Sequence, residues 1–174
     1  MYQKNKNELL EWIQAIVVAI ILALIIKTFV IETFLVDGES MLPTLHNADR
    51  LIVNKFIYHF KKPETGNIIV FKYPADPKSD FIKRVIAVEG QTVEIKNGKV
   101  FIDNEPLNEE YLNESTPGKF GPAKVPENHI FVLGDNRDNS RDSRFPDVGF
   151  VPLENVKGEA IFRIWPLSRF GLVK

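Results

Sequence analysis

Residues 92–103 read Thr92-Val93-Glu94-Ile95-Lys96-Asn97-Gly98-Lys99-Val100-Phe101-Ile102-Asp103, and this stretch says most about the fold. Two runs that alternate apolar and polar side chains flank Asn97-Gly98. That dipeptide suits a two-residue type I′ turn, because both central residues of such a turn need positive φ. Counting outward from the turn puts four β-branched side chains on one face, in the pairs Ile95–Val100 and Val93–Ile102. The stretch therefore predicts a β-hairpin.

Short β-rich runs recur on both sides of this hairpin, separated by Gly, Pro and Asn. Residues 104–127, which contain Pro106, Pro117, Pro122 and Pro126, are expected to form a long excursion from the sheet. The chain after Val36 is therefore predicted to be mostly β. The further strands are expected at Arg50–Val53, Asn67–Lys72, Phe81–Val88, His129–Leu133 and Val156–Ile164.

The composition excludes several classes of protein. The 174 residues include 22 Lys plus Arg and 23 Asp plus Glu, a formal net charge of −1, so no strongly basic field exists to hold a nucleic-acid backbone. An apolar content of 44% and a charged content of 26% are typical of a globular protein. The absence of cysteine excludes disulfide scaffolds, thiol nucleophiles and cysteine zinc sites.

Apolar residues are concentrated near the start of the chain. Ala15–Ile26 is uninterrupted, and the wider segment Trp12–Val36 contains few polar residues. About 20 residues are needed to cross a hydrocarbon core. A buried core helix would show a narrower apolar stripe, and a cleaved signal peptide would end in a small-x-small site that is missing here. An uncleaved signal-anchor helix is the favoured interpretation.

Charge before this segment predicts its orientation. Lys4 and Lys6 precede it, and the positive-inside rule then places the N-terminus in the cytoplasm. We expect a cytoplasmic tail at residues 1–12, a transmembrane helix at residues 13–36 that contacts membrane lipid, and an extracytoplasmic β domain at residues 37–174 with an insertion at about residues 98–127. The expected location is the cell membrane, with a single pass.

Three polar segments stand out after the anchor, at residues 37–44, 80–90 and 134–144. Taken singly, each has an ordinary structural explanation. Ser40 lies in a Gly/Pro-rich turn, Lys83 could be a charge on an edge strand, and the Asp/Asn/Arg/Ser run could be a solvated loop. A calcium loop from Asp135 fits poorly, because Arg137 and Ser140 stand where Asp or Asn and then Gly are needed.

Together, these segments resemble type I signal peptidases, and the single span resembles the Gram-positive form of that family. The resemblance implies a transmembrane helix followed by an antiparallel β-sheet catalytic domain with a small β cap. It also implies a membrane-bound serine endopeptidase that removes signal peptides from exported preproteins through an acyl-enzyme. The matching boxes are Gly-x-Ser-Met-x-Pro-Thr at Gly38–Thr44, a Gly-x-Ile-Val-Val-Phe-like run at Gly66–Phe71, Lys-Arg-Val-Ile-Ala at Lys83–Ala87, and Gly-Asp-Asn-Arg-Asp-Asn-Ser-x-Asp-Ser-Arg at Gly134–Arg144.

The same resemblance implies a Ser/Lys dyad, with Ser40 as nucleophile and Lys83 as general base. A serine hydroxyl is a weak nucleophile until a neighbouring base removes its proton. A lysine with an ordinary pKa of about 10.4 is charged at neutral pH and cannot be that base. Desolvation lowers the pKa of a lysine, and the apolar neighbours of Lys83 could supply it.

Other residues match supporting positions of the family. Ser140 matches the serine that orients the lysine amine, and Asp142 and Arg144 match a pair that braces the active-site loop. Gly38 stands where many relatives carry an oxyanion-hole serine, so the backbone N–H of Ser40 is expected to be the main donor. Met41 is expected to bind substrate. No metal or other cofactor is expected.

Two further assignments concern the membrane surface. Met41, Leu42 and Phe56–Lys62 could border that surface as an apolar and basic edge. A partly buried strand or turn explains Phe56–Lys62 equally well.

Rival functions fit less well. A Ser-His-Asp hydrolase would have to use His46, His59 or His129, and the residues around Ser40 lack the final Gly of a nucleophile elbow. A penicillin-interacting enzyme would need a Ser-x-x-Lys motif, which is absent from the sequence. A zinc enzyme would need clustered ligands, and the three histidines are scattered along the chain. The rival of a different class is a membrane-tethered β domain that binds exported proteins without chemistry.

Overall fold

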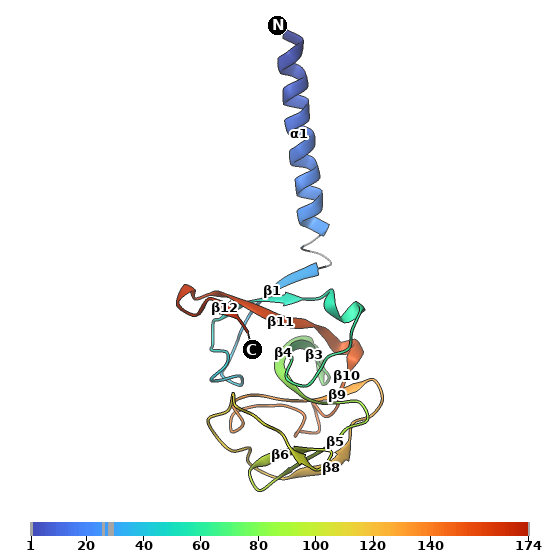
Figure 1. Cartoon of the computed structure of the whole chain (residues 1–174), viewed down its shortest axis with the longest axis vertical. Helices are drawn as coiled ribbons and strands as arrows, with labels where there is room; N and C mark the ends of the chain where they lie inside the picture. The colour runs from blue at the N-terminus through green and yellow to red at the C-terminus, as the bar shows by residue number, and fades with distance from the viewer. Residues whose placement is uncertain (1, 26, 28–29, 174) are drawn as a thin grey trace.

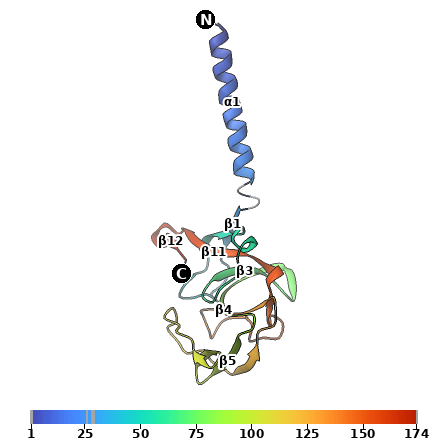
Figure 2. The same cartoon turned by 45° about the vertical axis from the view of Figure 1, so that its right-hand side comes forward.

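The structure is a computed structural model that describes residues 2–25, 27 and 30–173. A long helix, α1 (Tyr2–Ile25), projects from a body made of β-strands, and it stands clear of that body in both views (Figures 1 and 2). The described side chains of α1, from Glu8 to Leu24, are all exposed. None of the helices in the described part of the chain has both the length and the hydropathy that crossing a membrane requires.

The helix expected over residues 13–36 is wrong at its C-terminal end. α1 ends at Ile25, residues 26 and 28–29 of the expected span lie outside the described residues, and Ile31–Leu35 forms strand β1. β1 pairs with strand β2 (Arg50–Asn54), with Phe34 opposite Leu51. The β-branched Ile31 and Thr33 suit a strand, and the partner that selects it lies far along the chain.

The larger sheet forms the half of the body next to α1 (Figure 1). Its strand order is β1-β2-β11-β3-β4-β9-β10, with β12 paired to β11, and the neighbouring strands are antiparallel. Its remaining strands are β3 (Ile68–Tyr73), β4 (Asp76–Val88), β9 (His129–Leu133), β10 (Val151–Pro152), β11 (Val156–Trp165) and β12 (Gly171–Leu172).

The smaller sheet lies at the far end of the body and contains the predicted hairpin (Figure 1). The pairs Ile95–Val100 and Val93–Ile102 are confirmed, and Asn97 and Gly98 both have positive φ, 51° and 76°. The expected excursion at residues 104–127 instead returns to pair with the hairpin. The strand order is β7-β6-β5-β8, made of β5 (Thr92–Lys96), β6 (Lys99–Ile102), β7 (Glu105–Pro106) and β8 (Phe120–Lys124).

The strands predicted outside the hairpin all occur, with shifts at their ends. β4 begins at Asp76 rather than at Phe81, because its first residues are polar and give no apolar signal. Phe56–Lys62 contains the short 3-10 helix η2 (Ile57–His59), flanked by exposed Phe56 and Phe60. Two more 3-10 turns, η3 (Leu153–Asn155) and η4 (Leu167–Arg169), border β11.

The edges of β1 and β4 in the larger sheet lie near the site. β9 pairs with β4 only from Arg84 onward, so among the described residues no strand lies beside one edge of the preceding part of β4. β1 is the first strand of the same sheet, and its pairing partner in the described part of the chain is β2. Residues of β1 and of this part of β4 line a common pocket.

Candidate active site

A turn, a strand and a loop meet beside the pocket. Ser40 lies in the turn that follows β1, Lys83 lies in β4, and residues 134–144 form the loop that follows β9. Arg84 is opposite Leu133, so this loop begins next to Lys83. Asn136 joins the loop to the turn: its backbone N–H donates to the Ser40 carbonyl at 3.0 Å, and its Nδ2 donates to the Glu39 carbonyl at 3.1 Å.

Ser40 and Lys83, more than forty residues apart, are in direct contact. Lys83 Nζ lies 2.7 Å from Ser40 Oγ and donates a second hydrogen bond to the Ile82 carbonyl at 2.8 Å. The Lys83 residue is 4% exposed, so its amine is largely shielded from water. A hydroxyl and a buried amine at this distance can exchange a proton, as a nucleophile and its general base must.

The surroundings of Lys83 change its acidity. Burial lowers the pKa of its amine from 10.5 to about 8, because the charged form loses hydration, while the Asp142 and Asp135 carboxylates act in the opposite direction. At neutral pH the neutral amine is therefore a substantial species, whereas it is rare for an exposed lysine. The desolvation expected from the apolar neighbours is present in the structure.

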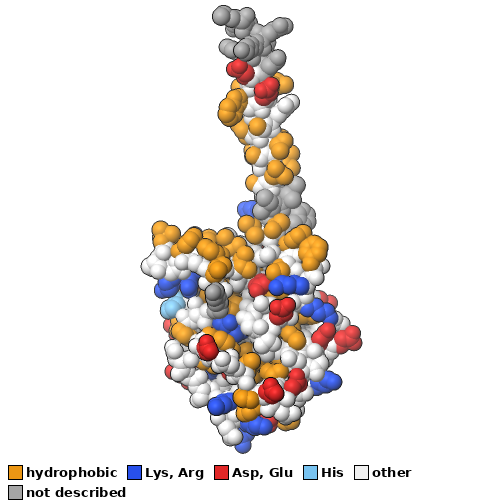
Figure 3. Space-filling model, in the orientation of Figure 1, with side chains coloured by type: hydrophobic (Ala, Val, Ile, Leu, Met, Phe, Trp, Pro, Cys, Tyr) orange, Lys and Arg blue, Asp and Glu red, His pale blue; other side chains and the backbone are white. Residues whose placement is uncertain are grey.

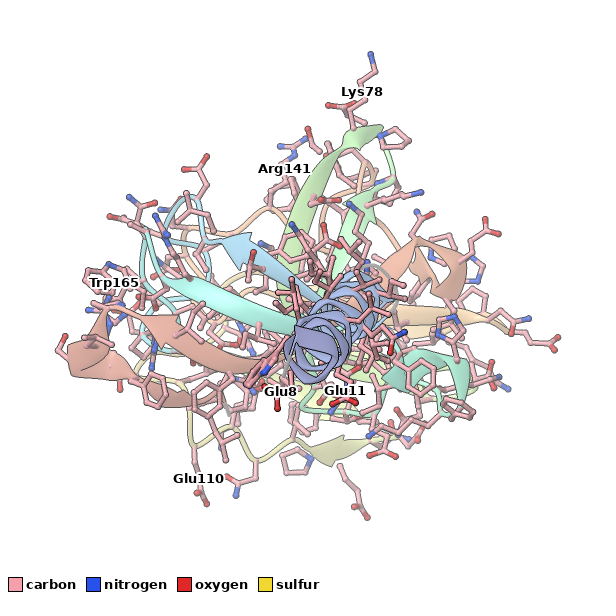
Figure 4. The ribbon with its side chains drawn as sticks, turned by 90° about the horizontal axis from the view of Figure 1, so that it is seen from above. Glu8, Glu11, Lys78, Glu110, Arg141 and Trp165 are labelled. Atoms are coloured by element: carbon pink, nitrogen blue, oxygen red, sulfur yellow. The ribbon has the colours of Figure 1, made fainter. Side chains whose placement is uncertain are left out.

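The pocket beside this pair has a volume of about 500 Å³. Its walls combine apolar side chains with the Ser40 hydroxyl and the Lys83 amine, and charged groups lie near the rim. Seen down α1, Arg141 lies beside β4, on the same side of the body as Lys78 (Figure 4). The sequence did not reveal these walls, which consist of Phe34, Leu35, Val36, Asp37, Ser40, Val70, Ser79, Asp80, Phe81, Ile82, Lys83 and Arg141.

Ser140 does not make its expected hydrogen bond to the Lys83 amine. Within the described part of the chain, its Oγ is buried and has no hydrogen-bond partner. Lys83 instead bonds to the carbonyl of its neighbour Ile82, which is within reach because β9 does not cover this part of β4. Ser140 nevertheless lies close to the Ser40 backbone, because both approach the same face of Gly134.

Gly134 is the contact point between the loop and the turn. A Cβ atom at this position would overlap the Ser40 carbonyl oxygen and the Ser140 side chain. We therefore expect Gly134→Ala to displace the Ser40 backbone and to lower kcat/KM about 100-fold, the cost of a misplacement of about 1 Å. Steady-state kinetics with a preprotein would measure this loss.

Gly98→Ala is the matched control for that variant. Gly98 has positive φ and a close neighbour in Ser115, but it lies in the hairpin turn of the smaller sheet. The Gly98→Ala variant should have a lower free energy of unfolding than the unmodified enzyme and nearly the same kcat/KM. Equal losses of activity in the two variants would mean that Gly134 acts only through stability.

Asp142 and Arg144 form the expected pair. Arg144 Nε and Nη2 donate to the Asp142 carboxylate at 2.8 and 2.9 Å, and that carboxylate accepts the Gly134 N–H at 3.1 Å. Arg144 Nη2 also donates to the Arg137 carbonyl at 2.8 Å. The Asp142–Arg144 pair therefore connects the C-terminal end of the 134–144 loop to its beginning, at Gly134 and Arg137.

Met41 is not where its expected role requires it. Its side chain is 1% exposed and belongs to a core cluster with Val36, Leu45 and Val70, so it neither lines the pocket nor borders a surface. The turn that exposes Ser40 buries the next side chain under it. Gly38 donates its backbone N–H to Asn47 Oδ1 at 3.0 Å, so this donor is already engaged.

A buried ion pair that sequence reasoning missed supports the site. Arg84 Nε and Nη2 donate to the two Asp135 oxygens at 2.9 and 2.7 Å, and Thr44 Oγ1 donates to the same carboxylate at 2.6 Å. The Tyr111 ring covers the Arg84 guanidinium at 3.8 Å. Both charges lie in segments that the sequence singled out, but only the sheet register shows that they meet. Such a bidentate pair fixes the loop against the strand.

No group of three or more His, Asp or Glu side chains that could hold a metal ion occurs among the described residues. The reactive groups that the structure brings into contact are the Ser40 hydroxyl and the Lys83 amine.

Comparison with known proteins identifies the family. The family model described as "Signal peptidase, peptidase S26" matches residues 9–165. This chain belongs to the signal peptidase family S26. It is therefore a hydrolase of the serine peptidase type, and the Ser40–Lys83 contact lies inside the matched region.

Individual relatives agree with this assignment. The chain is 46% identical to "Probable signal peptidase I-1" of Synechocystis sp., over 92% of this chain and 85% of that protein. It is 38% identical to "Signal peptidase I P" of Bacillus subtilis subsp. natto, over 99% of this chain and 97% of that protein. A crystal structure of a signal peptidase I from Enterococcus faecalis V583 matches with a TM-score of 0.51 and 35% identity, over 57% of this chain and 97% of that chain.

Proposed function

We propose that this peptidase removes N-terminal signal peptides from exported preproteins, with Ser40 as nucleophile and Lys83 as general base. The hydrogen bond of 2.7 Å between Lys83 Nζ and Ser40 Oγ carries the proposal, because it joins the hydroxyl to a largely water-shielded amine. The relatives named signal peptidase I supply the class of substrate.

In the proposed reaction, Ser40 Oγ attacks the carbonyl carbon of the residue at position −1 while its proton passes to Lys83 Nζ. The carbon–nitrogen bond then breaks, and Lys83 gives that proton to the departing amine. A water molecule, activated in turn by Lys83, hydrolyses the ester on Ser40. The amine thus acts first as a base and then as an acid in each half of the cycle.

The negative oxygen of the tetrahedral intermediate needs a hydrogen-bond donor. Gly38 offers no side chain, and its backbone N–H is engaged by Asn47. The Ser40 backbone N–H is therefore the main donor in the proposal, because it moves with the nucleophile and is the nearest main-chain donor along the chain.

The substrate is proposed to bind as an extended strand in the pocket between β1 and β4. Both elements have a free edge there, and an added strand can form main-chain hydrogen bonds to such edges. Phe34, Val70 and Ile82 make the adjoining walls apolar, which suits small side chains at positions −1 and −3.

The decisive experiment is cleavage of a preprotein by the purified full-length protein in detergent, followed by N-terminal sequencing of the product. A single cut directly after a small-x-small sequence is the expected result. A β domain that only binds exported proteins would retain the preprotein without cutting it, and that outcome would reject the proposal.

The proposed base also predicts the pH dependence. Lys83 must be neutral to accept a proton, and with a pKa of about 8 its neutral fraction is lost as the pH falls through that value. We expect kcat/KM to fall roughly 50-fold between pH 8 and pH 6 and to level off above about pH 9. A pH series in buffers of constant ionic strength measures this, and a rate that stays flat down to pH 5 would contradict a lysine base.

We further propose that α1 attaches the enzyme to the cell membrane. Exposed apolar side chains run along α1 from Leu9 to Leu24, and others gather on the adjoining part of the β domain (Figure 3). Exposed apolar side chains of the larger sheet and its adjoining 3-10 turns include Phe60, Trp165, Leu167 and Phe170. Burying such surface in lipid is favourable because water is released from it.

The proposed orientation is a single pass with a cytoplasmic N-terminus and an external β domain, as Lys4 and Lys6 predict. We expect the full-length protein to sediment with membranes after an alkaline wash. We also expect protease added to protoplasts or spheroplasts to cut its C-terminus. A C-terminus cut only after lysis would reverse the orientation.

A further inference from the structure

Phe81 lies against the amine of Lys83. The two residues are two positions apart in β4, so their side chains leave the strand on the same face. Lys83 Nζ lies over the Phe81 ring, 5.2 Å from its centre. This distance is within the range in which an aromatic face attracts a cation.

The neighbours of Phe81 hold its ring in this orientation. The Tyr73 ring stacks on it with centres 4.4 Å apart and planes 6° from parallel, and the Phe71 ring meets it edge-on at 6.2 Å. Tyr73 is itself fixed, because its hydroxyl donates to the Asp147 carboxylate, which also accepts a bond from Arg141 Nε at 2.7 Å. With Tyr73 against one face, the other face is the one that remains for the amine.

The electrostatics of this contact depend on the charge of Lys83. An aromatic face attracts an ammonium ion and has little preference for a neutral amine. In the resting enzyme the neutral amine is needed, and burial favours it. During attack by Ser40, however, the amine becomes charged in the same buried place, where little water can solvate it.

We propose that the face of Phe81 stabilises the ammonium that Lys83 becomes when it accepts the proton of Ser40. This proposal rests on the proposed function of the dyad. Phe81 lines the pocket, but its effect on catalysis acts through Lys83, so it is a positioning residue. The other charged groups that surround Lys83 are Asp135 and Asp142 in the 134–144 loop, Arg84 bound to Asp135, and Asp37, Asp80 and Arg141 around the pocket.

The proposal makes a distinctive prediction about the pH profile. Weakening the ring's attraction for a cation should lower the pKa of Lys83 and, above that pKa, should lower kcat/KM by roughly 3- to 30-fold. Well below the pKa, kcat/KM should be nearly unchanged, because Lys83 is then charged both in the resting enzyme and during attack. Thus kcat/KM stays the same on the acid side of the profile, while its plateau at high pH falls.

Fluorinated phenylalanines at position 81 test this in the full-length enzyme, because they weaken the π face with little change of shape. We expect the plateau to fall progressively from phenylalanine through its monofluoro and difluoro forms to pentafluorophenylalanine. Pentafluorophenylalanine at position 131 is the matched control, since Phe131 packs with Phe120 and Phe150 in the core on the side of the smaller sheet. The control should have the profile of the unmodified enzyme.

Two results would overturn the proposal. A fall of kcat/KM by the same factor at every pH would mean that Phe81 only shapes the peptide pocket. A rise in the pKa of Lys83 would mean that the ring only excludes water. If pentafluorophenylalanine disturbs folding, as circular dichroism would reveal, the monofluoro and difluoro forms still distinguish these outcomes. Failure of the unmodified enzyme to cut a preprotein would reject the dyad function itself, which is a separate outcome.

Discussion

Replacing Ser40 with alanine is expected to abolish signal-peptide cleavage, with a fall in kcat/KM of about 10⁴-fold or more. The substitution removes the oxygen that attacks the peptide carbonyl, and no acyl-enzyme can then form. The backbone N–H at position 40 and the pocket walls remain, so binding of the preprotein should change little. The loss should therefore appear in kcat rather than in KM.

The measurement is cleavage of a preprotein under single-turnover conditions, together with trapping of the acyl-enzyme by acid quenching. Ser168→Ala is the matched control, because Ser168 lies in η4 and does not line the pocket. The control should cleave normally. An acyl-enzyme that still forms in Ser40→Ala would show that another side chain is the nucleophile.

Replacing Lys83 with alanine is expected to cause a loss of similar size, again about 10⁴-fold. Ser40 Oγ would lose the base 2.7 Å away, and the leaving amine would lose its proton donor. Lys83→Met is the more informative variant, because methionine preserves most of the buried apolar stem and removes only the amine. Both variants should also lose the rise in activity through about pH 8.

Lys72→Met is the control for this pair, since Lys72 lies in the adjacent strand β3 with an exposed side chain. It should retain both the rate and the pH profile of the unmodified enzyme. Full activity in Lys83→Met, combined with loss of activity in His129→Ala, would favour a histidine base and reject the dyad. Thermal unfolding of each variant separates these effects from loss of stability.

Much of the fold was predictable because its signals are local. The Asn97-Gly98 turn and the alternating side chains around it specify the hairpin within a dozen residues, and the pairs that they predict are the pairs that form. β1 and β8 lack such signals. β1 continues an apolar segment and is selected by pairing with β2, while β8 contains Gly121 and Pro122, which are poor strand residues.

The candidate site was predictable in its residue types but not in its contacts. Ser40, Lys83, Asp142 and Arg144 were singled out by their motifs, and both pairs are in contact. The missing bond of Ser140 and the burial of Met41 depend on the path of the backbone, which no motif encodes. The Arg84–Asp135 pair likewise depends on the register between β4 and β9.

The length of β1 bears on where the substrate is cut. It is a strand of five residues, about 17 Å long, that begins on the side of α1 and ends just before the turn of Ser40. A hydrogen-bonded strand has nearly constant length, unlike a flexible linker of the same residues. Seen down α1, β1 runs across the body rather than away from the helix (Figure 4). If α1 holds the enzyme at the membrane, β1 acts as a spacer that sets how far to the side of the helix the reactive hydroxyl lies. The peptide bond that reaches this position would then be selected by its place relative to α1 as well as by its sequence.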